Sequence, residues 1–152
     1  MIDSLFPLES DDGSLTPEHT LYEWSQLLIK ASEKFARSLT DAKDHKRRLR
    51  DQGFINVVEQ RYKWPTNGKW PDSKHLKRIG EWTHFNIDRS LEGLSMALLT
   101  RGHGWTQEEV LAYLPAVRKD MRDPAIKAYW PVLVVYGQKP DLPLEAEGPM
   151  PM

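Results

Sequence analysis

The chain has 152 residues, of which 39% are hydrophobic and 28% charged, and this length suits one globular domain rather than two. The formal net charge of -1 gives no overall field that would attract nucleic acid or an anionic membrane. The sequence has no cysteine, which excludes disulfides, thiolate metal sites and a cysteine nucleophile. It shows neither a signal-peptide pattern nor a membrane-spanning run, so we expect a cytoplasmic or nuclear location.

The N-terminal segment predicts a loop followed by an amphipathic helix. Residues 1–16 are acidic, rich in turn-forming residues and without periodicity. Within them, Asp11 and Asp12 precede a glycine, which favours a turn over a cation site. Thr16 can cap a helix over residues 17–37, because a proline suits the first helical position and apolar residues then recur at spacings of three and four.

A short helix and a strand are predicted next. Thr40 can cap a helix over residues 41–52, and Gly53 stands where a left-handed C-terminal stop is needed. Lysines and arginines are frequent over residues 43–50, but the aspartates between them favour a solvated face over contacts with phosphate groups. β-Branched and aromatic residues predict a strand over residues 54–62, which a following Trp-Pro pair ends.

A long helix is predicted over residues 74–101, with one apolar stripe and Gly102 as its stop. Gly80 and Gly93 interrupt it, and each costs up to about 1 kcal/mol relative to alanine, so we expect a kink or a close packing contact there. The Gly-x-Gly sequence that begins at Gly102 follows a helix rather than a strand. It therefore predicts a helix end and a turn, not a nucleotide-binding loop.

The last third predicts a helix, a buried strand and a tail. Thr106 and Glu109 have the spacing of a capping box, which opens a helix that ends near Met121. Residues 129–137 form a continuous apolar run, which is typical of a strand buried on both faces. Prolines and acidic residues alternate in residues 141–152, which predicts a disordered tail.

Few residues have the spacing of a catalytic site. The five histidines are scattered without metal-ligand spacing, so no metal site is predicted. His84 is the weak catalytic candidate, because it lies among aromatic residues and can accept a proton from a substrate hydroxyl; a packed or solvated histidine is the alternative. Trp70, Trp82 and Phe85 surround the start of the long helix and are candidates for lining a substrate pocket, with core packing as the alternative.

The predicted elements leave a strand without enough neighbours. A sheet of only two strands is marginal in water, and a flat apolar strand with an unpaired edge promotes aggregation. Residues 132–136 must therefore be covered by helices or by strands from sequence that is not present here.

The order of these segments resembles the C-terminal half of class I S-adenosylmethionine-dependent methyltransferases. The closest resemblance is to the fungal group associated with secondary metabolism, which is distantly similar to trans-aconitate methyltransferases. The matching segments are residues 49–57, Trp64-Pro65 with Trp70-Pro71, residues 91–94, residues 104–110, and Asp123-Pro124 through Lys139-Pro140.

The resemblance implies an α/β fold, namely an incomplete Rossmann-like methyltransferase domain over residues 1–140. It would be mostly helical, with two to three strands from the C-terminal edge of the sheet and a helical insertion at about residues 65–125 between the last two strands. The implied cofactor is S-adenosylmethionine, but the Gly-rich loop and acidic residue that hold it in this family are absent from the sequence. We therefore name no cofactor-binding residue, and we expect a truncated family member that does not transfer methyl groups alone.

An alternative function is a non-catalytic protein-interaction module derived from a methyltransferase, which can associate with a full-length relative. The methyl acceptor of the first hypothesis, a small molecule or a protein, is not identified by these residues. Neither nucleic acid nor a membrane is an expected partner, given the balanced charge and the absence of an apolar span.

Overall fold

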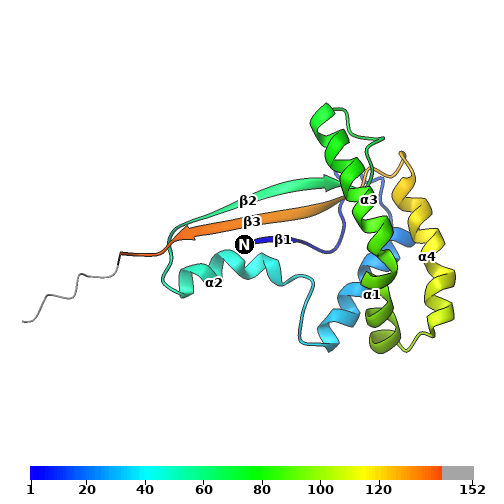
Figure 1. Ribbon diagram of the computed structural model, residues 1–152, viewed down its shortest axis with the longest axis horizontal. Helices are drawn as coiled ribbons and strands as arrows, with labels where there is room; N and C mark the ends of the chain where they lie inside the picture. The colour runs from blue at the N-terminus through cyan, green and yellow to red at the C-terminus, as the bar shows by residue number, and fades with distance from the viewer. Residues whose placement is uncertain (142–152) are drawn as a thin grey trace, which may run out of the picture.

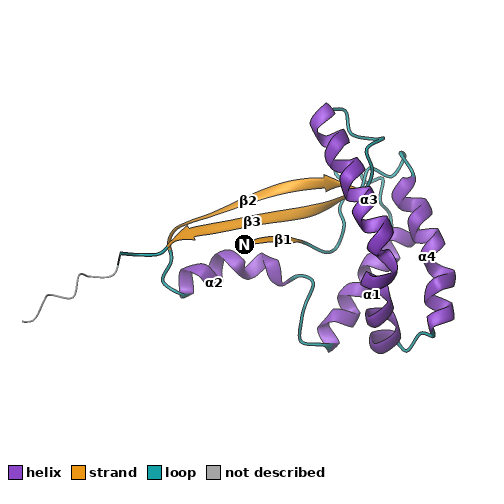
Figure 2. Cartoon of the chain, in the orientation of Figure 1, coloured by secondary structure: helices purple, strands orange, loops and turns teal. Residues whose placement is uncertain are grey.

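A three-stranded antiparallel sheet lies beside a layer of helices in the computed structural model, which describes residues 1–141 (Figures 1 and 2). The strands are β1 (Ile2–Ser4), β2 (Ile55–Pro65) and β3 (Tyr129–Gln138), in the spatial order β1-β3-β2. This confirms the predicted α/β class with up to three strands. Nearly all of the predicted tail, residues 142–152, lies outside the described residues.

Four α-helices are present in residues 1–141: α1 (Thr20–Lys34), α2 (His45–Asp51), α3 (Lys74–Ala97) and α4 (Gln107–Arg122). Helices α1, α3 and α4 contact one another at one end of the sheet, whereas α2 runs along β2 and β3 (Figure 1). Because α3 and α4 both lie between β2 and β3 in the sequence, the predicted helical insertion between the last two strands is confirmed.

Strand β1 corrects the prediction that residues 1–16 form only a loop. It pairs with β3 from Ile2 opposite Val134 to Ser4 opposite Val132, and the N–H of Leu5 extends the ladder to the carbonyl of Pro131 at 2.7 Å. Three residues are too few to show a period, so the sequence carried no signal for this strand. The edge of β3 that was expected to be unpaired is thus covered over these residues.

Helix α1 begins later than predicted, at Thr20. Thr16 does not cap it; the Thr16 N–H instead donates to Nδ1 of His19 at 3.0 Å, and His19 occupies the N-cap position. The free N–H of Leu21 donates to the carboxylate of Asp120 in α4 at 2.9 Å. A distant side chain therefore satisfies the helix start, which local sequence reasoning could not have found.

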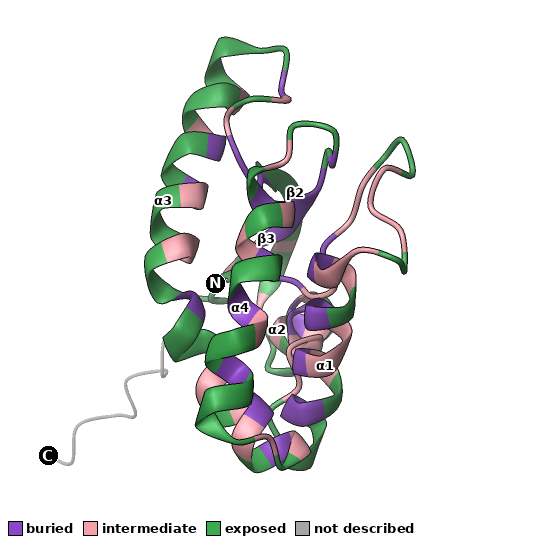
Figure 3. Ribbon diagram, turned by 90° about the vertical axis from the view of Figure 1, so that its right-hand side faces the viewer, coloured by how far each residue is buried: buried purple, intermediate pink, exposed green. Residues whose placement is uncertain are grey.

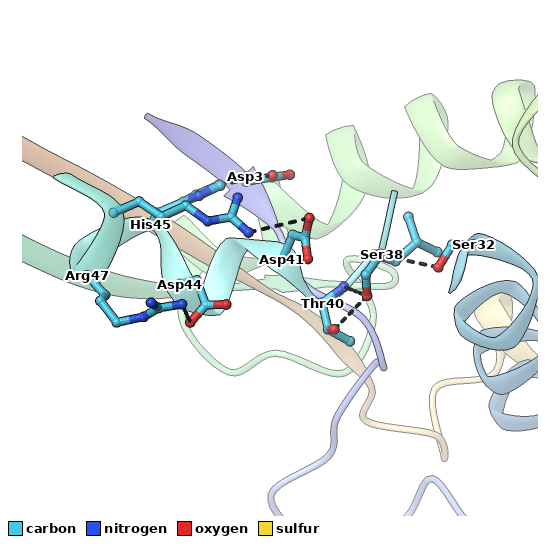
Figure 4. Close-up of polar contacts among 10 residues, drawn as sticks. Asp3, Ser32, Ser38, Thr40, Asp41, Asp44, His45 and Arg47 are labelled. Atoms are coloured by element: carbon cyan, nitrogen blue, oxygen red, sulfur yellow. Dashed lines mark hydrogen bonds and ion pairs between the residues drawn. The ribbon is translucent and has the colours of Figure 1, made fainter. Parts of the chain in front are cut away.

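The segment before α2 also differs from the prediction (Figure 4). The Thr40 hydroxyl is hydrogen-bonded to that of Ser38 at 2.7 Å rather than to the helix, and a 3₁₀ turn at Asp41–Asp44 precedes α2. The basic residues of α2 lie on a solvated face, as predicted, and Arg47 pairs with Asp44 at 3.1 Å.

The two interior glycines of α3 have different surroundings. A Cβ at Gly80 would lie 2.2 Å from the carbonyl oxygen of Asn67, whereas a Cβ at Gly93 would have no neighbour within 4 Å. Of the two expected features, a kink or a close packing contact, the close contact is present at Gly80 and not at Gly93. Beyond Ala97, the helix continues as a π-helical turn at Leu98–Gly102.

The predicted capping box at the start of α4 is confirmed. The Glu109 N–H donates to the Thr106 hydroxyl at 3.1 Å, and the Thr106 N–H donates to the Glu109 carboxylate at 2.7 Å. Both groups of the pattern are close in sequence, so the local signal was sufficient.

The main hydrophobic core lies within the helical layer rather than on the sheet (Figure 3). Its largest buried side chains include Trp24 from α1, Leu91 from α3 and Leu114 from α4, and Trp130 of β3 joins it. A smaller cluster around Leu133 lies between β3 and α2. Over residues 1–141, no helix combines the length and apolar character needed to cross a membrane.

Candidate functional site

The first half of α3 projects from the core and exposes much of its surface (Figure 3). Trp82 is 64% exposed and Phe85 is 50% exposed, so neither serves the core-packing role that was the alternative for them. A pocket lies on each of two faces of this helical segment. These two pockets are the candidate sites.

The larger pocket has a volume of about 600 Å³ and lies between α3 and the loop that follows β2. We call it the His84 pocket. Phe85 supplies an apolar wall and Arg89 stacks on its ring, with the guanidinium carbon 5.0 Å from the ring centre. The polar lining includes Asn67, Lys69, Glu81, His84, Asp88 and Arg122.

The loop that forms one wall of the His84 pocket is fixed by hydrogen bonds to distant backbone groups. The Thr66 hydroxyl donates to the carbonyl of Ala128 at 3.0 Å, and the Asn67 amide donates to the carbonyl of Met121 at 2.8 Å. Both side chains are buried, so these bonds form away from competing water. The close contact with Gly80 then holds α3 against this wall.

His84 is half-buried, and its Nδ1 is buried without a hydrogen-bond partner among residues 1–141. Asp88, one turn along α3, does not orient the imidazole, because its carboxylate accepts from Arg118 at 3.2 Å and from Arg122 at 3.1 Å.

The structure does not bring all the predicted pocket residues together. Phe85 lies with His84 in the larger pocket, but Trp82 lines the second pocket together with Trp64 of β2. Trp70 is half-buried and lines neither of these two pockets, and its indole N–H is buried without a partner.

Sequence reasoning missed several polar residues of the His84 pocket. Glu81 and Asp88 stand three residues before and four residues after His84, so helical periodicity alone places them on its face. Arg122 and Asn67 come from α4 and from the loop after β2. No local pattern joins these segments, and only the tertiary fold reveals them.

The acidic loop before α1 forms structural contacts rather than a cation site. Asp12 accepts a hydrogen bond from the Ser14 N–H at 3.0 Å, which confirms the predicted turn. Hydrogen bonds from Lys63 and from Tyr129 hold the pKa of Asp11 below its ordinary value. Burial, reinforced by the Asp11 carboxylate, raises the pKa of Tyr129. Across residues 1–141, no group of three histidine or acidic side chains is placed to hold a metal ion.

The glycine that follows β2 does not offer a cradle for a nucleotide cofactor. A Cβ at Gly68 would lie 2.6 Å from the carbonyl oxygen of Lys77 and from the Cγ atom of Glu81, so the missing side chain accommodates α3. A donor-binding turn instead leaves its backbone amides open to the ligand. This part of the structure therefore does not fit S-adenosylmethionine.

Comparison with known proteins shows that the chain is similar to fungal methyltransferases. It is 37% identical over 137 residues to "Probable methyltransferase tdiE" of Emericella nidulans, a match that covers 90% of this chain and 43% of the relative. It is 33% identical over 121 residues to "Protein-methionine methyltransferase laeA" of Chaetomium globosum, covering 79% of this chain and 38% of the relative. "Secondary metabolism regulator LAE1" of Cochliobolus heterostrophus is 33% identical over 122 residues, covering 78% of this chain and 39% of the relative.

These relatives show that the chain is similar to part of fungal methyltransferases and of regulators of secondary metabolism. This similarity confirms the resemblance predicted from the sequence. It spans less than half the length of these curated relatives. No protein-family model and no solved structure matches it.

Proposed function

We propose that this chain provides the acceptor side of an S-adenosylmethionine-dependent methyltransferase, and that the His84 pocket receives the group to be methylated. The relationship to fungal methyltransferases supports methyl transfer as the reaction class. The structural observation that carries the assignment is a mixed apolar and polar pocket of about 600 Å³ that contains an uncommitted histidine. We place this activity in the cytoplasm or nucleus.

In this proposal His84 accepts the proton that an acceptor hydroxyl or amine loses as it is methylated. Asp88 does not hold the ring, because its carboxylate is paired with Arg118 and Arg122, so this carboxylate does not fix the tautomer that meets the acceptor. The Phe85 ring excludes water from one side of the pocket, which favours a desolvated nucleophile. S-adenosylmethionine would supply the methyl group, and the packing of Gly68 supports the view that these residues alone do not hold it.

Two measurements test this proposal. Calorimetric titration of the purified chain with S-adenosylmethionine is expected to show no binding. Micromolar affinity would contradict the proposal that the donor binds to residues other than these.

In the form of the protein that transfers methyl groups, His84→Gln is expected to lower kcat by about 100-fold, which is the lower end of the range for general-base catalysis. His75→Gln is the matched control, because His75 lies on the other face of α3. Equal effects of both substitutions would contradict a role for His84.

A second candidate function is a non-catalytic interaction module, favoured by the exposed face of the sheet. Val58, Tyr62 and Trp64 alternate along β2 and share a face with Tyr136 of β3, and these side chains are 37–51% exposed. A contiguous uncharged aromatic face of this kind is typical of a protein interface. A full-length relative is the partner that we propose for it.

Tyr62→Glu tests the second function. A charge in the middle of this face is expected to abolish co-purification with a full-length relative, because burying an unpaired carboxylate is costly. Glu59→Gln is the control, since residue 59 points to the opposite face of β2. Unchanged co-purification of Tyr62→Glu, or equal loss in both variants, would contradict this interface.

A further inference from the structure

A second pocket, of about 370 Å³, lies on the other face of α3, where the helix meets the end of β2. Trp64 and Trp82 line it, so we call it the Trp64–Trp82 pocket. Its volume falls within the range of small-molecule sites. We propose that it binds a planar aromatic carboxylate of about two fused rings, a ligand class distinct from the acceptor in the His84 pocket.

The aromatic part of this ligand is inferred from the two tryptophans. Trp64 is 41% exposed and Trp82 is 64% exposed, although both are large side chains that gain stability from burial. Aromatic pairs in residues 1–141 involve neither ring, so both remain available to a ligand. Ile79 of α3 adds an aliphatic side chain to the lining. A flat ring would cover more of this surface than a flexible chain of equal size, at a lower cost in conformational entropy.

The carboxylate is inferred from the charges at the pocket. Arg78 and His75 line it, and Lys74 joins these two residues in an adjoining depression. No acidic residue lines either hollow, and neither Arg78 nor Lys74 forms an ion pair with any residue from 1 to 141. An arginine beside an apolar wall can bind a carboxylate through two parallel hydrogen bonds. The pocket therefore complements a negative ligand.

Two uncharged polar side chains in the lining distinguish the pocket from a plain apolar groove. Thr83 is buried and Asn86 is exposed, and both side chains line the pocket with hydrogen-bonding atoms that can meet a ring substituent. The His84 pocket, in contrast, has the acidic residues Glu81 and Asp88 in its lining, and Arg122 is paired with Asp88 there. The two pockets thus differ in whether acidic side chains line them.

Calorimetric titration with 2-naphthoate tests the inference on the purified chain. Two related probes act as controls: 2-naphthamide keeps the rings without the charge, and cyclohexanecarboxylate keeps the charge without the aromatic rings. We expect naphthoate to bind at least tenfold more tightly than either control. Equal affinity of naphthoate and either control, or no binding of naphthoate at millimolar concentration, would overturn the inference. The measurement needs no methyl donor, so its outcome is independent of the proposed methyl transfer.

Substitutions locate the binding. Arg78→Gln is expected to weaken naphthoate binding at least tenfold, because the loss of even one hydrogen bond to a charged group has an effect of about this size. Trp82→Ala should weaken binding by a similar factor. Because Trp82 is exposed, this substitution should leave the protein folded, which far-UV circular dichroism checks. Lys77→Gln is the matched control, because Lys77 is an exposed cation of α3 outside the pocket lining. An effect of Lys77→Gln as large as that of Arg78→Gln would refute the site.

Discussion

Gly80→Ala is expected to destabilise the protein although it places a better helix former in α3. Alanine gains about 1 kcal/mol over glycine in a helix interior. The new Cβ would lie 2.2 Å from the carbonyl oxygen of Asn67 and 2.9 Å from the backbone nitrogen of Gly68, so backbone must move. The loop cannot retreat easily, because the Asn67 amide is held by Met121. Overpacking of this kind costs about 1–3 kcal/mol, and the tight contact places it in the upper part of that range, so we expect a net loss of about 1–2 kcal/mol.

Gly93→Ala supplies the matched control in the same helix. Its Cβ would meet nothing within 4 Å, so the propensity gain of up to about 1 kcal/mol should appear undiminished. Urea unfolding followed by circular dichroism measures both variants, and thermal midpoints should move in opposite directions by about 2–4 °C per kcal/mol. If Gly80→Ala raised the free energy of unfolding as much as Gly93→Ala, the packing of α3 against the pocket wall would be refuted.

Three further substitutions test other parts of the fold. Thr106→Ala should lower the free energy of unfolding by about 1 kcal/mol in urea titration, and an unchanged midpoint would contradict the capping role shared with Glu109. Trp24→Phe removes the indole N–H that donates to the Ser95 hydroxyl at 2.9 Å. We expect the free energy of unfolding to fall by at least about 1 kcal/mol. If the effects of Trp24→Phe and Ser95→Ala were additive in a double-mutant cycle, the hydrogen bond would contribute nothing. Asp11 has a lowered pKa in the folded state, so its contribution is present above pH 4 and is lost as the pH falls through the folded pKa. Asp11→Asn should therefore lower stability at pH 7 but not at pH 2, and an equal effect at both pH values would contradict the ion pair to β2.

The sequence was sufficient to predict the end of an element wherever nearby residues of the same segment satisfy its polar groups. The capping box at Thr106 and the left-handed Gly53, with a φ of 85°, are determined by residues within a few positions. The start of α1 could not be predicted in this way, because Asp120 of α4 accepts the hydrogen bond from the free N–H of Leu21. Gly80 and Gly93 look alike in sequence, and only the loop brought against α3 separates them.

Only the part of the candidate site that lies within one helix was predictable from the sequence. The helical spacing of Glu81, His84 and Asp88 places them on one face from sequence alone. Trp82 and Phe85 were grouped as lining one pocket, but the end of β2 and the loop after it divide their surroundings into two. Trp82 and Phe85 line different pockets because of where Trp64 and Asn67 lie beside α3, and the tertiary fold determines these positions.

Folding and ligand binding are supported by different parts of α3, which makes the proposed tests interpretable. The second half of the helix is held in the core by Leu91 and Ser95, both of which are fully buried. The first half carries His84, Arg78 and Trp82, which line pockets and contribute little to that core. Polar or small substitutions at these three positions should therefore change binding without lowering the free energy of unfolding by more than about 0.5 kcal/mol, the usual range for surface sites.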